Sequence, residues 1–319
     1  MGGSSAAANP PGTGRRPADR VHGSDRMADG TRRPARGRGV GSLGPGLYIV
    51  ATPIGNAADV SLRALDVLKA VDAIACEDTR VTSKLLAIHG ISTPLLSYHD
   101  HNAERVRPGL IERLKRGESV ALASDAGTPL ISDPGFKLVQ AALEDHVPVT
   151  ALPGPSAVLT ALVLSGLPTD RFLFAGFLPA RRNARRKTLA ELASVNATPV
   201  LMESAKRLAA SLRDMADVLG DRPAAVAREM TKLFEEVRRE PLPALARHYD
   251  ETGAPKGEVT IVVGPPGEPA PVSAGDLDRR LTEVLATHSV RDAADLVAHA
   301  FGVPRRRVYA RALELKRGR

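Results

Sequence analysis

The chain has 319 residues, of which 43% are hydrophobic and 25% charged, so it is long enough for two domains that each bury a core. A single cysteine, Cys76, excludes an intrachain disulfide and a cysteine-based metal cluster, and it favours a reducing, cytoplasmic setting. The longest apolar run, residues 157–164, is too short to span a bilayer and no signal peptide is visible, so we expect no membrane partner.

The net charge of +8 is concentrated at the two ends of the chain. Residues 1–46 carry eight Arg and three Asp, and residues 304–319 carry seven Lys or Arg and one Glu. These basic ends can contact a polyanion or act as solubilising tails. Residues 1–45 are rich in Gly, Pro, Arg and Ala and poor in large apolar residues, which predicts a disordered basic arm acting as a tail.

Short apolar runs alternate with amphipathic stretches from Leu47 onward, as is typical of βα units. The expected strands are 47–51, 72–76, 95–97, 119–123 and 147–151. The expected helices are 61–70, 103–116, 136–145 and 157–165. We therefore predict an N-terminal α/β domain over residues 46–166.

Each expected strand ends in a loop of turn formers and polar residues, and in an open α/β sheet that edge is where ligands bind. The most distinctive loop, Ser124–Gly135, holds two each of Gly, Pro, Asp and Ser. Such a segment suits a sharp turn that offers backbone amides to a ligand, although an ordinary βα turn has similar residues. Within it Asp133 and Pro134 are typical of a helix N-cap and a first helical residue.

A second α/β domain is expected over residues 167–265, with a mixed or antiparallel arrangement around an expected strand at 233–238. Its other strands are expected at 172–175, 199–202, 224–227 and 259–263, with a basic helix after 175 and a helix over 205–219. Residues 266–274 are predicted to be a linker and 275–319 a helical tail. The tail has the outline of a helix-turn-helix, which can contact nucleic acid or serve as a plain helical cap.

Six ordered motifs identify a family. They are Leu47–Asn56, Glu77–Arg80, Tyr98–Asn102, Ser124–Gly135, Pro153–Ala157 and Gly176–Pro179. Together they resemble the ribosomal RNA small subunit methyltransferase I family, within the tetrapyrrole-methylase superfamily, over residues 46–264 and more loosely in the tail. The resemblance implies a homodimeric enzyme of two α/β domains that uses S-adenosyl-L-methionine. Its substrate would be 16S ribosomal RNA or the small ribosomal subunit, methylated on the ribose 2′-oxygen of a decoding-region cytidine.

The resemblance also implies a methyl-donor site in the cleft between the two domains. The residues at matching positions are Pro53, Asp125, Ala126, Gly127, Thr128, Ser156 and Ala157 from the first domain and Met202, Ala227 and Val259 from the second. Several of them have a structural alternative: Asp125 can brace the turn at Gly127, Ser156 can cap a helix, and Met202 can be a core residue.

Methylation of a ribose hydroxyl requires a group that accepts its proton. We expect Asp100 or Glu77 in this role, ahead of His99, His101, Asp78 and Glu203, and hydrogen bonding within loops is the alternative for each. The run His99-Asp100-His101 has the chemistry of metal ligands, but adjacent residues point in different directions, so we predict no metal site.

RNA contact is expected from a basic cluster of five cations: Arg181, Arg182, Arg185, Arg186 and Lys187. No acid lies among them, so we expect their mutual repulsion to be relieved by phosphates, in preference to a merely solvated face. Arg80 and residues 305–307 are secondary candidates. Tyr98 and Phe177 are available for stacking on bases, or are core residues.

Two other functions remain open from the sequence. One is a C-methyltransferase of a tetrapyrrole or precorrin substrate, which would not need the basic cluster. The other is a non-catalytic RNA-binding factor, against which the complete glycine and proline loops argue.

Overall fold

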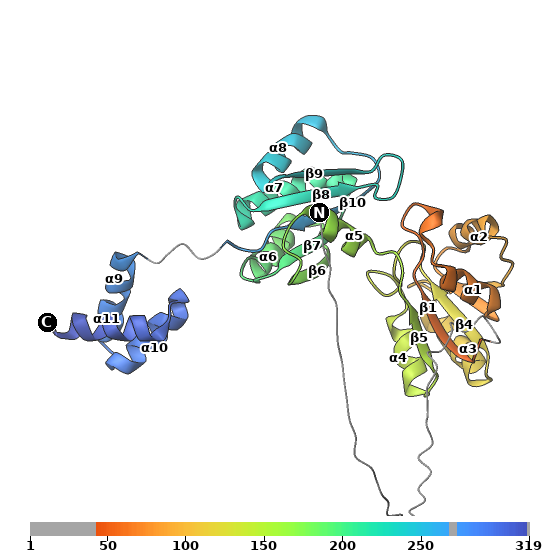
Figure 1. Ribbon diagram of the computed structural model, residues 1–319, viewed down its shortest axis with the longest axis horizontal. Helices are drawn as coiled ribbons and strands as arrows, with labels where there is room; N and C mark the ends of the chain where they lie inside the picture. Colours follow the sequence, from red (N-terminus) through yellow and green to blue (C-terminus); the bar gives the residue numbers. More distant parts are fainter. Residues whose placement is uncertain (1–42, 268–272, 318–319) are drawn as a thin grey trace, which may run out of the picture. The chain divides into compact units, whose positions relative to one another are not determined.

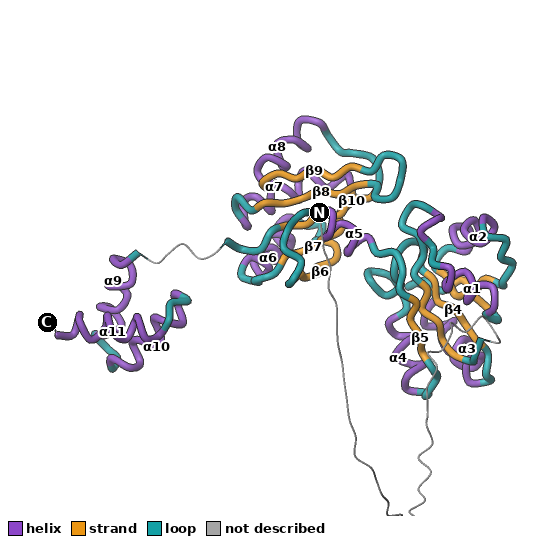
Figure 2. The backbone as a smooth tube through the Cα atoms, viewed as in Figure 1, coloured by secondary structure: helices purple, strands orange, loops and turns teal. Residues whose placement is uncertain are grey.

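The computed structural model describes residues 43–267 and 273–317 of the chain (Figure 1). The arm expected at residues 1–45 therefore lies outside the described residues, apart from its last three. The middle of the expected linker, residues 268–272, also lies outside them. The strands form two five-stranded sheets, shown in orange in Figure 2, and helices accompany each of them.

The first sheet is wholly parallel and has the strand order β3-β2-β4-β1-β5. Its strands are β1 (Gly46–Val50), β2 (Ala73–Cys76), β3 (Leu95–Ser97), β4 (Ser119–Ala123) and β5 (Val149–Leu152). Its helices are the 3₁₀ turn η1 (Ala57–Asp59), α1 (Leu62–Ala70), α2 (Thr79–Ile88), α3 (Ala103–Lys115) and α4 (Phe136–Glu144). The predicted alternation of strands and helices is confirmed, and all five strands end at one edge of the sheet.

Helices cover both faces of this sheet, which explains why its strands are almost continuously apolar. Leu47 and Ile49 of β1 pack in the core formed with α3 and α4. Val50 faces the opposite way, into the core formed with α1 and α2. Alternate residues of one strand thus serve two cores, as the period of two residues requires.

For this part of the chain the sequence-based prediction is wrong about one helix start and omits one helix. Helix α4 begins at Phe136 with Gly135 as its N-cap, so Asp133 and Pro134 are not the cap and first helical residue. Gly135 has a φ of 133°, and a Cβ there would lie 2.6 Å from Leu122 Cδ2, so the chain enters the helix where only glycine fits. Helix α2, which buries Thr82 and Leu86, was not predicted.

The second sheet is mixed, as predicted, with the order β6-β7-β10-β8-β9; β6 and β7 are parallel and the other pairs antiparallel. Its strands are β6 (Phe172–Phe177), β7 (Thr198–Ser204), β8 (Pro223–Arg228), β9 (Glu236–Pro241) and β10 (Glu258–Val263). One face is covered by α6 (Arg182–Ala193), α7 (Leu208–Leu219), preceded by the 3₁₀ turn η2 (Ala205–Arg207), and α8 (Leu242–Thr252). Helix α8 was not predicted, and β9 begins three residues later than expected.

Helix α5 (Ala157–Ser165) covers the other face of the second sheet, although it directly follows the last strand of the first. Its residues Ala161 and Leu162 pack with Val200, Ala225 and Val262. The helix ends at Gly166, which has a φ of 72° and lies at the expected domain boundary. Helix α5 therefore ties the carboxyl edge of the first sheet to the core of the second.

The C-terminal tail forms three helices: α9 (Ala274–Leu285), α10 (Val290–Phe301) and α11 (Arg305–Arg317). Leu281, Val297 and Val308 help to form a small core of their own. Gly302, with a φ of 62°, makes the turn between α10 and α11, as the helix-turn-helix outline predicts. None of the helices in the described parts of the chain is long and apolar enough to cross a membrane.

Candidate functional site

A cavity of about 610 Å³ is lined by residues from both sheets. From the loops of the first sheet come Ile54, Asp125, Ala126, Ile131, Ser132 and Asp133, and from α5 comes Ala157. From the second sheet and its loops come Phe177, Met202, Glu203, Ser204, Ala205, Lys206, Glu229, Met230, Gly257, Glu258, Val259 and Thr260. The apolar walls and the few carboxylates are typical of a site for a small organic ligand.

Backbone hydrogen bonds between the loops after β1 and β4 build the first-sheet side of the cavity. Thr52 N donates to Gly127 O at 2.9 Å, and Gly127 N donates to Thr52 O at 3.0 Å. Gly127 has a φ of 82°, which favours glycine, and Ser124 Oγ donates to Gly127 O at 3.0 Å. These bonds fix the turn that presents Asp125 and Ala126 to the cavity.

Five of the ten residues predicted to bind the donor line this cavity: Asp125, Ala126, Ala157, Met202 and Val259. The other five lie next to it and support it. Pro53 precedes Ile54, Gly127 and Thr128 hold the loops, Ser156 caps α5, and Ala227 is buried beside Thr260. Thr128 Oγ1 donates to Pro155 O at 3.1 Å, and Ser156 Oγ accepts from Leu159 N at 3.4 Å. The role of each in donor binding stays a prediction.

Carboxylates gather at the first-sheet edge of the cavity. Burial, and next the charge of Glu77, raise the pKa of Asp133 to about 6, against a hydrogen bond from Ser124 that lowers it. Burial also raises the pKa of Glu77, with Asp125 and Asp100 adding to the shift. Asp133 is therefore a carboxylate on the cavity wall whose pKa is close to neutral pH.

The two predicted catalytic carboxylates, Glu77 and Asp100, lie in different places relative to the cavity. Glu77 and Asp125 line a smaller hollow of about 420 Å³, together with Asp78 and His99. Asp100 is exposed and is absent from the described lining of both hollows. Asp133, predicted to be a helix cap, instead lines the cavity and was not among the predicted site residues. The signal that could have found it is its place in the loop after a parallel strand.

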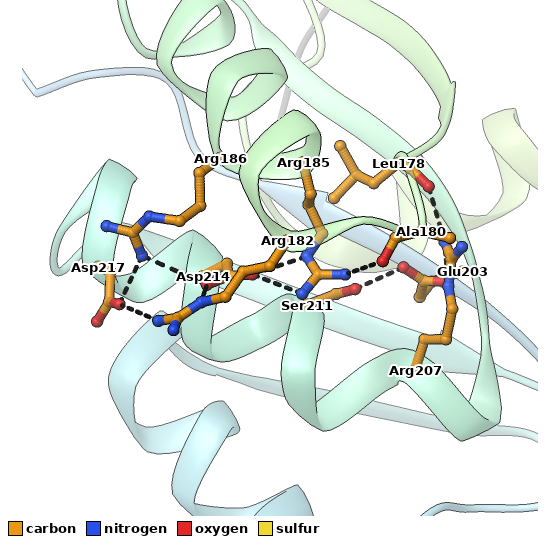
Figure 3. A network of polar contacts seen from close by, with 10 residues as sticks. All are labelled: Leu178, Ala180, Arg182, Arg185, Arg186, Glu203, Arg207, Ser211, Asp214 and Asp217. Carbon is orange, nitrogen blue, oxygen red and sulfur yellow. Dashed lines mark hydrogen bonds and ion pairs between the residues drawn. The ribbon is translucent and has the colours of Figure 1, made fainter.

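Glu203 lines the cavity, but donors on the protein occupy its carboxylate (Figure 3). It accepts from Arg207 Nε at 2.7 Å, from Ser211 Oγ at 2.6 Å and from Ser204 N at 2.8 Å. Arg207 also donates from Nη2 to Leu178 O at 2.8 Å. Glu203 thus acts as an anchor that holds the ends of β6 and β7 beside the cavity.

The basic cluster is paired with acids from α7, so the premise that its cations repel one another is wrong (Figure 3). The side chain of Arg185 is 7% exposed and forms an ion pair with Asp214. Arg182 and Arg186 reach Asp214 at 3.1 and 3.3 Å, and Arg186 reaches Asp217 at 2.7 Å. Arg181 and Lys187 are exposed and form no ion pair within the described residues.

The secondary candidates for RNA contact also differ from one another. Arg80 is exposed but pairs with Asp78 at 2.6 Å, which lowers the pKa of Asp78 to about 2. In the tail Arg305 pairs with Asp295, whereas residues 306 and 307 are exposed. Tyr98 is 1% exposed and belongs to the core, which leaves Phe177 as the accessible aromatic of the two.

The sequence and the fold match a known class. Residues 46–246 match the family model of the Tetrapyrrole (Corrin/Porphyrin) Methylases, and residues 271–316 match that of the RsmI C-terminal HTH domain. Among solved structures, a diphthine synthase superposes with a TM-score of 0.54 at 17% identity, covering 68% of this chain and 89% of that one. A uroporphyrin-III-C-methyltransferase from Thermus thermophilus gives 0.51 at 21% identity, covering 69% and 94%. The fold is that of a tetrapyrrole methylase.

Closer relatives define the family within this class. A ribosomal RNA small subunit methyltransferase I from Mesorhizobium japonicum is 49% identical over 291 residues, covering 91% of this chain and 97% of the relative. One from Escherichia coli O157:H7 is 44% identical over 271 residues, covering 84% and 94%. The chain belongs to the ribosomal RNA small subunit methyltransferase I family.

Proposed function

We propose that this protein uses S-adenosyl-L-methionine to methylate the ribose 2′-oxygen of a cytidine in 16S ribosomal RNA. The observation that carries the proposal is a cavity to which the loops of both sheets contribute, with apolar walls and an acidic edge. The names of the relatives support ribosomal RNA as the substrate.

The residues of the cavity fit the proposed donor. Its volume of about 610 Å³ lies within the range of about 300–1,000 Å³ that is usual for ligand sites. Met202, Met230 and Val259 offer apolar contact to an adenine ring, and the carboxylate of Asp125 suits a cationic group. When bound, S-adenosyl-L-methionine supplies a methyl group that is already activated on a positively charged sulfur.

The protein's own tasks are then to align the hydroxyl, to exclude water and to accept a proton. We assign proton acceptance to Asp133, because it lines the cavity and its pKa is raised to about 6. Glu77 assists, since its charge raises the pKa of Asp133. Asp100 contributes to the same shift from an exposed position, and a direct catalytic role for it stays a prediction.

Nucleotide mapping by mass spectrometry tests the proposed function. Small subunits from cells that lack the gene are incubated with the purified protein and S-adenosyl-L-methionine. We expect one new 2′-O-methylcytidine in the 16S RNA. A methyl group on a base, or no transfer to RNA, would contradict the proposal, and transfer to a tetrapyrrole would favour the alternative substrate class. The homodimer also stays a proposal, which light scattering of the full chain would test.

A further inference from the structure

An exposed phenylalanine stands at the wall of the cavity. Phe177 is the last residue of β6, is 57% exposed, and is the aromatic side chain in the described lining of the cavity. Exposure alone does not set Phe177 apart, because Phe136 and Phe234 are more exposed, but of these three it is Phe177 that belongs to the described cavity lining. The pairing of β6 accounts for this position.

A β-bulge turns Phe177 toward the cavity. Phe174 pairs with Val200 and Gly176 with Leu201, so Ala175 is an extra residue in β6. Leu173 and Ala175 pack against the core under α6, α7 and α8, and in an unbroken strand Phe177 would lie on their side of the sheet.

After the bulge Phe177 pairs instead with Met202, which lines the cavity. Gly176 has a φ of 63°, a conformation that favours glycine and recurs in bulges. The bulge interrupts the regular pairing of β6 with β7 and places the ring of Phe177 at the cavity.

The backbone that follows Phe177 is held in place. Leu178 is buried, and its carbonyl accepts the hydrogen bond from Arg207 Nη2 (Figure 3). Arg207 is itself fixed by Glu203. An aromatic side chain on such a support loses little conformational freedom when a ligand stacks on it.

The bulge also lies near the proposed proton acceptor. A Cβ on Gly176 would lie 3.8 Å from Ser132 Oγ, and Ser132 directly precedes Asp133 in the loop. The end of β6 is therefore within reach of the base of a nucleotide whose ribose hydroxyl meets Asp133. Lys206, exposed and also on the cavity lining, offers a charge for an adjoining phosphate.

From these observations we propose that Phe177 is the stacking platform for the base of the nucleotide that is methylated. The proposal rests on the proposed function and adds a substrate-binding residue to it. Stacking on an aromatic ring is open to any base, so Phe177 holds the nucleotide in place while other groups read its identity.

Substitution of Phe177 tests this role, with Phe172→Ala as the matched control. Phe172 lies on the same strand, is also exposed, and is absent from the described cavity lining. Methyl transfer to unmethylated small subunits is measured by kcat/KM, and donor affinity by calorimetry. For Phe177→Ala we expect kcat/KM to fall about 10- to 100-fold with donor affinity unchanged. Phe177→Trp should retain most of the activity, and Phe172→Ala should match the wild type.

Several results would overturn the proposal. If Phe177→Ala matches the wild type, the ring does not contact the substrate. If donor affinity falls as much as kcat/KM, Phe177 belongs to the donor site. If Phe177→Leu restores activity as well as Phe177→Trp, stacking is not the interaction. The wild-type protein tests the proposed function separately. If it transfers no methyl group, the role of the ring is decided by binding to the small subunit without turnover, compared between the Phe177 and Phe172 variants.

Discussion

Arg185 donates two hydrogen bonds to one carboxylate oxygen of Asp214, from Nε at 2.8 Å and from Nη2 at 2.6 Å. Both side chains are almost fully buried, at 7% and 2% exposure. Arg185 also donates from Nη1 to Ala180 O at 3.2 Å. The most basic stretch of the sequence is therefore partly a structural element that fastens α6 to α7.

The protein should unfold more easily when Arg185 is replaced. Arg185→Met removes the main partner of the buried Asp214 carboxylate but leaves Arg182 and Arg186 beside it. The free energy of unfolding, from denaturant titration, should therefore fall by less than the about 3–5 kcal/mol that a fully unpaired buried charge costs. Lys187→Met on the exposed side of the same helix is the control, and we expect it to change little. Equal effects of the two substitutions would show that the pair does not stabilise the fold.

The exposed members of the basic cluster should act on RNA instead. Arg181→Ala with Lys187→Ala removes two cations that pair with no acid in the described structure. We expect weaker binding to the small subunit and a salt dependence whose logarithmic slope is smaller by about 1–2, because fewer phosphates are neutralised. Unfolding and donor affinity should stay the same. An unchanged slope would remove both residues from the RNA-contact surface.

Asp133→Asn should slow methyl transfer without preventing donor binding. Loss of a proton acceptor lowers kcat by about 10²–10⁴-fold. In the wild type kcat should fall as the pH drops below about 6, the pKa of Asp133. Glu77→Gln should move this inflection to lower pH, because the charge of Glu77 raises that pKa. A pH profile that Glu77→Gln leaves unchanged would contradict the assignment.

Asp133→Asn should also stabilise the folded protein at neutral pH. The pKa of Asp133 is raised from 3.8 to about 6, so ionisation at pH 7 disfavours the folded state. Asp133→Asn removes that penalty, which solvent screening of the half-buried carboxylate keeps below the about 3 kcal/mol of the full shift. The gain in unfolding free energy should be constant above pH 6 and shrink between pH 6 and 4. A loss of stability at pH 7 would show that the carboxylate has favourable partners.

Gly257 should be needed for the shape of the cavity. It has a φ of 93°, and a Cβ there would lie 2.0 Å from Glu229 Oε1, beside the cavity that both residues line. Gly257→Ala should weaken donor binding in calorimetry by displacing Glu229. Gly253→Ala is the matched control, because its φ is 80° but no atom lies within 4 Å of the added Cβ. Equal losses of donor affinity in both variants would show that backbone strain, and not the displacement of Glu229, is the cause.

Local signals predicted much of the fold. The strands at 95–97 and 119–123 have the expected bounds, and Ser156 caps α5 as its position before an apolar run indicates. These features depend on neighbours along the chain. The pairing of Arg185 with Asp214 depends on a distant contact instead. The two residues are 29 positions apart, and only the packing of two helices brings them together.

The parts of the site that sequence reasoning missed depend on distant contacts in the same way. The neighbours of Asp133 in the sequence favour it as a helix cap, yet the N-cap of α4 is Gly135, which has a positive φ and lies against Leu122. The bulge at Ala175 becomes visible only when β6 is paired with β7. Helix α5 follows the first sheet in the chain but packs on the second, a choice that its apolar composition alone does not specify.

Calorimetric titration with S-adenosyl-L-methionine tests the central claim, that the cavity shared by the two sheets holds the methyl donor. Ala157→Leu fills the cavity from the first residue of α5, and Ala190→Leu adds the same bulk to an exposed position of α6. We predict that the wild type and Ala190→Leu bind one donor per chain with equal affinity, and that Ala157→Leu binds at least tenfold more weakly. Equal affinity of all three proteins would place the donor elsewhere and contradict the account.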